Sequence, residues 1–166
     1  AHLLLARIAL RRGNVAEAER EAQAAAADSS RRAEAGVLAA QARVAQGRFA
    51  EALQLLDGIR RQTAGAKVLD LEATRGDALA RLERGAEAEQ AFRAELAAFP
   101  HNRDAYTKLA ILYVTMGRVE DAERTLEQMF AANPSRSTAN LAAETWSVVE
   151  NRSAAARWRA RAARVE

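Results

Sequence analysis

Apolar residues recur along most of the chain at spacings of three and four positions, as on one face of an α-helix. Tyr106, Leu109 and Tyr113, for example, fall on one such face. Residues that end helices interrupt this pattern at regular intervals, and the segments between them are about 11–17 residues long. Short connections place consecutive helices antiparallel. The pattern predicts ten helices, arranged as five consecutive helix hairpins.

The interruptions repeat with a fixed period. Gly13 and Gly47 are 34 residues apart, and so are Gly117 and Asn151. We expect each of these Gly or Asn residues to adopt the positive φ that ends a first helix. An alanine stands five positions after each of them, at Ala18, Ala52, Ala122 and Ala156. A period of this size indicates stacked units that bury their apolar faces against one another.

This pattern resembles the tetratricopeptide repeat (TPR), a helix-turn-helix unit of about 34 residues. The fourth repeat is the best match, with Tyr106, Leu109, Ala110, Tyr113, Gly117, Ala122 and Pro134 at the characteristic positions. The resemblance implies an all-α fold, a right-handed TPR solenoid of about four and a half repeats in one domain, residues 1–166. The repeats are approximately residues 1–32, 33–66, 69–102, 103–136 and 137–166.

The third and fifth repeats depart from the pattern. In the third, the turn glycine is displaced to Gly85, and Glu72 and Arg75 stand where apolar residues are expected. In the fifth, the aromatic positions are not aromatic. In every hairpin we expect small residues of the two helices, such as Ala110 and Ala122, to face each other and let the backbones approach closely.

The composition agrees with an all-helical protein, since Ala, Leu, Glu and Arg favour helices and aromatic residues make up only 5% of the chain. The chain has no cysteine, which excludes disulfides and thiolate metal sites. It begins at Ala1 within a helical pattern and without Met, so we expect a fragment of a longer, bacterial protein. The compartment is left open between cytoplasm and periplasm.

Few residues suit catalysis. His2 and His101 are the only histidines, and no nucleotide-binding, metalloprotease or hydrolase motif occurs. Glu17, Glu19 and Glu21 alternate along a helix and therefore diverge around its axis, so we interpret them as solvated charge near a helix N-terminus. We predict that the protein is not an enzyme and has no cofactor and no metal site.

The resemblance implies that the first helices of the repeats line a concave groove that holds a peptide. The family's basic clamp for a chaperone's C-terminal carboxylate is missing, because its positions carry Leu3, Arg7, Leu38, Asp70 and Thr74. We predict a peptide-binding site of Glu34, Asp70, Asp77, Arg81, Asp104, Lys108 and Ile111. Other side chains expected to face the groove are Arg7, Val37, Leu38, Gln41, Thr74, Thr107, Val114, Leu141, Thr145 and Val148.

The acidic members of this site favour a basic or amphipathic partner segment. Glu34, Asp70 and Asp104 also fall in first turns, where acids stabilise the helix dipole without binding anything. Asp77 is in mid-helix and is not explained in that way. Two alternatives remain: an accessory domain that packs against a catalytic domain of the same protein, and a module that forms homo-oligomers through its apolar residues.

The last helix is basic, with Arg152, Arg157, Arg159, Arg161 and Arg164 around Trp158. The net charge of the whole chain is only +3, well below that of typical nucleic-acid-binding domains. No stretch is apolar enough to span a membrane. We therefore interpret this helix as a polar-faced cap, with Trp158 covering the core and Trp146 near it, and predict no nucleic-acid partner.

Overall fold

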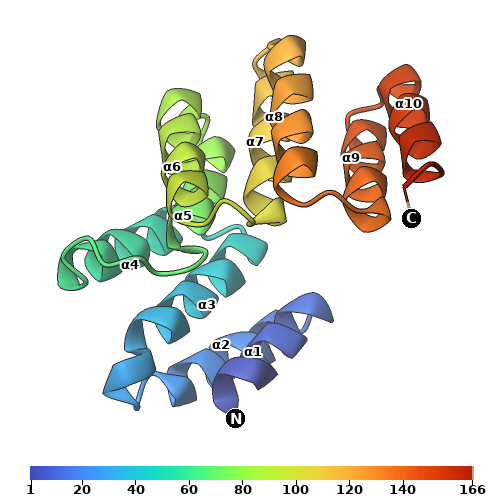
Figure 1. Ribbon diagram of the computed structural model, residues 1–166. Coiled ribbons are helices and arrows are strands. Elements are labelled where there is room, and N and C mark those ends of the chain that lie inside the picture. The colour runs from blue at the N-terminus through green and yellow to red at the C-terminus, as the bar shows by residue number, and fades with distance from the viewer. Residues whose placement is uncertain (166) are drawn as a thin grey trace. The chain divides into compact units, whose positions relative to one another are not determined.

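The computed structural model describes residues 1–165, and in this range it contains ten α-helices, one short 3₁₀-helix and no strand (Figure 1). The predicted all-helical class and the number of helices are confirmed. The helices are α1 (His2–Arg11), α2 (Val15–Ala25), α3 (Arg32–Ala45), α4 (Phe49–Gln62), α5 (Leu71–Arg81), α6 (Gly85–Ala98), α7 (Arg103–Thr115), α8 (Val119–Ala132), α9 (Arg136–Val148) and α10 (Arg152–Ala162), with η1 (Ser29–Arg31) before α3.

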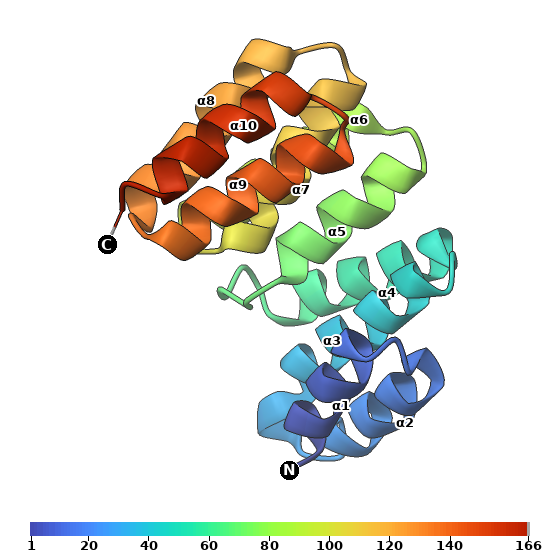
Figure 2. The ribbon, with the colours of Figure 1, turned by 90° about the vertical axis from the view of Figure 1, so that its right-hand side faces the viewer.

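The chain divides into two compact units, one of residues Ala1–Ala91 and one beginning at Phe92. In the first, each helix from α1 to α5 packs against the next, and α3 also contacts α1 and α5. In the second, α7 packs against α8, and α9 contacts α7, α8 and α10 (Figure 2). The first helices of successive hairpins therefore lie side by side within each unit, as α1, α3 and α5 and as α7 and α9.

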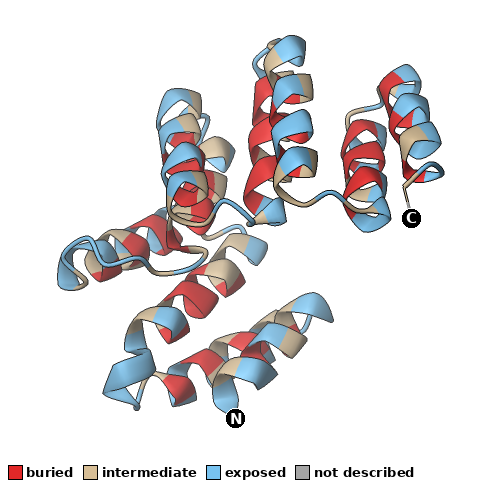
Figure 3. Cartoon of the chain, viewed as in Figure 1, coloured by how far each residue is buried: buried red, intermediate tan, exposed pale blue. Residues whose placement is uncertain are grey.

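Small residues form the contact inside the hairpins. Ala40 and Ala52 are fully buried, and so are Ala110 and Ala122, which confirms the predicted close approach of the paired helices. Figure 3 shows the buried residues along the faces where helices meet. At Gly36, an added Cβ would lie only 2.6 Å from Cδ1 of Ile59 on α4. The largest side chains in the cores are Trp146, Trp158, Phe92, Leu56, Leu79, Leu126 and Met129.

The turns inside the hairpins contain one residue with positive φ each, as predicted for three of the five. Gly13, Gly47 and Gly117 have φ values of 75°, 77° and 74°. In the third hairpin this position is held by Glu83, with φ of 60°, and the prediction for Gly85 was wrong because Gly85 is the first residue of α6. A left-handed conformation is accessible to residues other than glycine at a cost of about 1–2 kcal/mol.

The fifth hairpin contains a second correction. Glu150, with φ of 60°, is the turn residue, whereas Asn151 caps α10 by accepting a hydrogen bond from the amide of Ala154 at 3.1 Å. Glu150 follows Gly117 by 33 residues, one fewer than predicted. The residue five positions after the turn is consequently Ala155, which is 1% exposed, while Ala156 is exposed. The prediction that Ala156 is the buried alanine was wrong by one position.

These two glutamates give a testable result. Glu83→Gly is expected to raise the free energy of unfolding by about 0.5–1 kcal/mol, because removal of the left-handed strain outweighs the larger backbone entropy of glycine in the unfolded chain. Thermal unfolding followed by circular dichroism measures the change. The control Glu120→Gly, at an exposed position in α8, should destabilise instead. Equal destabilisation by both substitutions would contradict the assignment.

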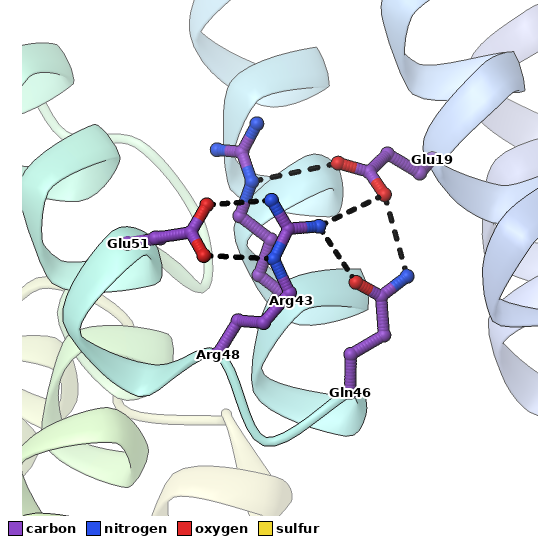
Figure 4. Close-up of polar contacts among 5 residues, drawn as sticks. All are labelled: Glu19, Arg43, Gln46, Arg48 and Glu51. Atoms are coloured by element: carbon purple, nitrogen blue, oxygen red, sulfur yellow. Dashed lines mark hydrogen bonds and ion pairs between the residues drawn. The ribbon is translucent and has the colours of Figure 1, made fainter.

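Ion pairs join neighbouring helices of the first unit. Glu19 of α2 lies 3.4 Å from Nε of Arg43 on α3 and 3.5 Å from Nη1 of Arg48, and it accepts a hydrogen bond from Gln46 at 3.3 Å (Figure 4). The guanidinium of Arg48 also hydrogen-bonds Glu51, which lowers the pKa of the Glu51 carboxyl. The interpretation of Glu19 as solvated charge was therefore wrong.

The charged residues that interrupt the third repeat are also paired across helices. Nε of Arg75 on α5 donates to Asp57 of α4 at 2.9 Å. Glu72 on α5 lies 3.2 Å from Nε of Arg60, which is also on α4. A polar contact between α4 and α5 thus takes the place of the apolar contact that the repeat pattern predicts.

Candidate peptide-binding site

In the first unit, the predicted site lies on α3 and α5, which are held together by buried polar atoms. Nε2 of Gln41 donates to Oγ1 of Thr74 at 3.3 Å, and Oγ1 of Thr74 donates to the carbonyl of Asp70 at 2.6 Å. Thr74 is only 3% exposed. Its hydroxyl is therefore a structural link between two first helices, and the prediction that Thr74 faces a ligand was wrong.

The four predicted charged residues of this unit differ in their surroundings. Glu34 is exposed in the first turn of α3, and Asp70 is half-buried just before α5, with φ of 65°. The carboxylate of Asp77 lies 3.7 Å from Nε of Arg81, one helical turn later. The side chain of Arg81 is 66% exposed and that of Asp77 is 21% exposed. Arg81 therefore offsets the negative charge of Asp77 and remains accessible itself.

In the second unit, the predicted residues lie along α7. Asp104 is exposed in its first turn, and Lys108 and Ile111 are half-buried one and two turns further on. Opposite charges four positions apart are a favourable arrangement on a helix. This face of α7 is therefore mixed in charge, with an apolar side chain at Ile111.

A pocket of about 490 Å³ lies where α7 and α9 meet. Nη1 of Arg103 donates across it to Oγ of Ser137 at 3.2 Å. Its lining residues are Arg103, Arg136, Ser137, Asn140, Leu141 and Glu144. Of these, sequence reasoning anticipated only Leu141 as a side chain that faces a ligand.

The other lining residues of α9 were missed because the fifth repeat was placed one residue late. Ser135, directly after Pro134, was the signal that would have corrected it, since serine is a preferred N-cap. Its Oγ accepts a hydrogen bond from the amide of Thr138 at 3.1 Å. With α9 beginning at Arg136, its exposed face carries Asn140 and Glu144.

The same error explains Thr145, which was expected to face the groove and is buried. Val37 and Leu38 of α3 were also expected there and are buried in the core. Val148, by contrast, is 70% exposed. The seven predicted site residues retain some exposure and are divided between the units, four in the first and three in the second.

Two further features bear on the chemistry of the described residues 1–165. No group of three or more histidine, aspartate or glutamate side chains in that range is placed to hold a metal ion. No helix in the same range has the length and apolar character needed to cross a membrane.

The helix-hairpin architecture matches a known family of repeats. A family model of the tetratricopeptide repeat matches residues 9–74 and 79–144, which together are more than half of the chain. The chain belongs to the tetratricopeptide repeat family. TPR domains are in general protein-interaction modules and are typically not catalytic. No curated protein matches this TPR domain in sequence.

Solved structures with the TPR fold resemble the whole chain. A thermophilic TPR protein of Thermus thermophilus superposes with a TM-score of 0.78 at 17% identity, over 97% of this chain and 88% of that one. MamA from Desulfovibrio magneticus RS-1 gives 0.63 at 17% identity, over 98% and 92%. YrrB, a TPR protein with an unusual peptide-binding site, gives 0.56 at 19% identity, over 97% and 82%. At these identities the likeness concerns the fold.

The basic last helix of the TPR domain is partly neutralised by α8. Arg161 lies 2.7 Å from Glu127, and Arg157 lies 3.4 Å from Glu123. The guanidinium of Arg161 also stacks over the ring of Phe130, 4.0 Å from its centroid. These arginines therefore hold α10 against α8, as the interpretation of α10 as a packing helix requires.

Proposed function

We propose that this TPR domain is a non-catalytic scaffold that binds a basic or amphipathic segment of a partner protein along the exposed faces of its first helices. The contact residues are Glu34, Asp70, Asp77, Arg81, Asp104, Lys108 and Ile111.

The observation that carries the proposal is the side-by-side arrangement of α3 and α5. The link from Gln41 to Thr74 forms a buried support, and charged side chains remain accessible above it. The ion pair of Asp77 with Arg81 is long, at 3.7 Å, and its arginine is largely exposed. A partner lysine or arginine can compete with Arg81 for the Asp77 carboxylate at little cost, since exposed ion pairs contribute only about 0–1 kcal/mol.

Two further features support a peptide ligand. In the second unit, Ile111 offers a half-buried apolar contact beside the charges of Asp104 and Lys108, which suits an amphipathic segment. YrrB, which shares the fold, is described as having a peptide-binding site. The same kind of ligand is what we propose for this chain.

Charge reversal tests the proposal. The triple variant Asp70→Arg, Asp77→Arg and Asp104→Arg is expected to lose the protein partners that the wild type retains in affinity capture from a cell lysate. Like charges placed opposite a basic segment cost several kcal/mol in binding. Mass spectrometry identifies the retained proteins, and circular dichroism confirms that the variant is folded.

The matched control reverses the same number of charges on second helices, with Glu17→Arg, Glu51→Arg and Glu120→Arg. It should retain the partners of the wild type. Identical capture by all three proteins would refute the role of the acidic residues. Light scattering over a range of protein concentrations tests the alternative of self-association, which predicts a mass that rises with concentration.

A further inference from the structure

The pocket between α7 and α9 continues into a second depression. That depression, of about 320 Å³, lies where α9 and α10 meet, and Arg136 and Asn140 line it as well as the first pocket. Figure 2 shows α9 with α7 and α10 as its neighbours. We call the combined hollow the arginine pocket. Its residues are Arg103, Arg136, Ser137, Asn140, Leu141, Glu144, Arg159, Ala162 and Ala163.

The three arginines of this pocket make hydrogen bonds only to neutral oxygens of residues 1–165. Arg103 donates to Ser137 Oγ at 3.2 Å, Arg136 to the carbonyl of Val165 at 3.2 Å, and Arg159 to the hydroxyl of Ser147 at 2.9 Å. A guanidinium has five N–H donors, so each arginine keeps several for a ligand. In contrast, Arg157 and Arg161 on α10 are paired with carboxylates.

The charge of the pocket favours an anion with a single negative charge. Three guanidinium groups face one carboxylate, that of Glu144, which leaves a formal excess of two positive charges. Glu144 has no ion pair or side-chain hydrogen bond within the described chain, and the same holds for the amide of Asn140. A doubly charged phosphate would be repelled by Glu144, whereas a carboxylate matches the planar fork of an arginine.

The remaining lining residues indicate the chemistry next to that carboxylate. Leu141 is half-buried and offers an apolar contact. The carboxylate of Glu144, one turn after Asn140, is an acceptor for an N–H group of the ligand. A peptide C-terminus has all three parts, namely a carboxylate, an apolar last side chain and a backbone N–H.

We propose that the arginine pocket binds the C-terminal carboxylate of a peptide that ends in an apolar residue. Arg103 and Arg136 hold the carboxylate, Asn140 donates to it, and Glu144 accepts the backbone N–H. The pocket uses none of the residues assigned to the acidic contact site, so the two sites stand or fall separately.

Nuclear magnetic resonance on the ¹⁵N-labelled chain tests this site with two probes, acetyl-Gly-Ala-Leu as the free acid and the same peptide amidated at its C-terminus. The free acid is expected to shift the Nε–H signals of Arg103 and Arg136 and the side-chain amide of Asn140 in a saturable way. The amidated peptide should bind about tenfold more weakly or not at all, since it lacks the charge-assisted bonds.

Variants show which side chains hold the carboxylate. Arg103→Gln and Arg136→Gln should each weaken binding of the free acid about tenfold. Arg136→Lys should have an intermediate effect, because lysine keeps the charge but not the planar fork. The matched control is Arg152→Gln, which removes an exposed charge on α10 outside the pocket and should leave binding unchanged.

Three outcomes would overturn the proposal: equal shifts from the acid and the amide, equal weakening by Arg136→Gln and Arg152→Gln, or tighter binding of inorganic phosphate than of the free acid. The variant with Asp70, Asp77 and Asp104 changed to Arg should still bind the free acid. Failure of the acidic contact site would therefore leave the result for the arginine pocket intact.

Discussion

Trp158→Ala is expected to lower the free energy of unfolding by about 3–5 kcal/mol, the largest stability effect of any substitution considered for this chain. Trp158 is 2% exposed. Its ring meets Phe130 edge to face, with centroids 5.9 Å apart and an angle of 61°, and Arg161 stacks over it at 4.8 Å. Urea unfolding followed by circular dichroism measures the loss.

The loss should be concentrated near α10, because hairpins in a repeat protein contact mainly their neighbours. Hydrogen exchange of the amides of α9 and α10 should therefore accelerate more than that of α3 and α4. The control is Arg157→Ala, on the exposed side of the same helix, which should change stability by at most about 1 kcal/mol. If Trp158→Ala were no more damaging than Arg157→Ala, the packing of α10 would be incorrect.

Ala155→Leu is expected to destabilise the protein by about 1–3 kcal/mol, because Ala155 is buried where α9 and α10 meet and has no space for three further carbon atoms. Ala156→Leu, one position later, should change stability by no more than about 0.5 kcal/mol, since that side chain is exposed.

The comparison of these two alanines is decided by thermal unfolding of both variants under the same conditions. The 34-residue spacing in the sequence predicts the opposite order, with Ala156 as the sensitive position. Greater destabilisation by Ala156→Leu would therefore restore the sequence-based placement and contradict the structure.

Helical periodicity and small residues made most of the fold predictable from the sequence. Ala18, Ala52 and Ala122 mark the closest approach of paired helices, and their regular spacing places three of the hairpins correctly. The turns at Glu83 and Glu150 were not predictable in this way. A glutamate reaches the left-handed conformation only at an energetic cost, so the usual rule assigns such a turn to glycine or asparagine.

The candidate site was predictable only in part, for two physical reasons. The one-residue shift after Pro134 moved every side chain of α9 around the helix by about 100°, which hid Arg136 and Asn140. Ion pairs between helices, such as Glu19 with Arg43, depend on packing that a pattern along one helix does not contain. The acidic residues of the first turns were found because their positions repeat with the hairpins.

The pairing of α10 with α8 also limits how the repeats could be rearranged. Glu123 and Glu127 meet Arg157 and Arg161, and each partner is 34 residues further along the chain. Helix α10 contains no acidic residue. A chimera that duplicated the fifth repeat would therefore set arginine against arginine at the new junction. The hairpins share one architecture, yet their charges fix their order, so recombination between them would yield a stable array only where acid and base still meet.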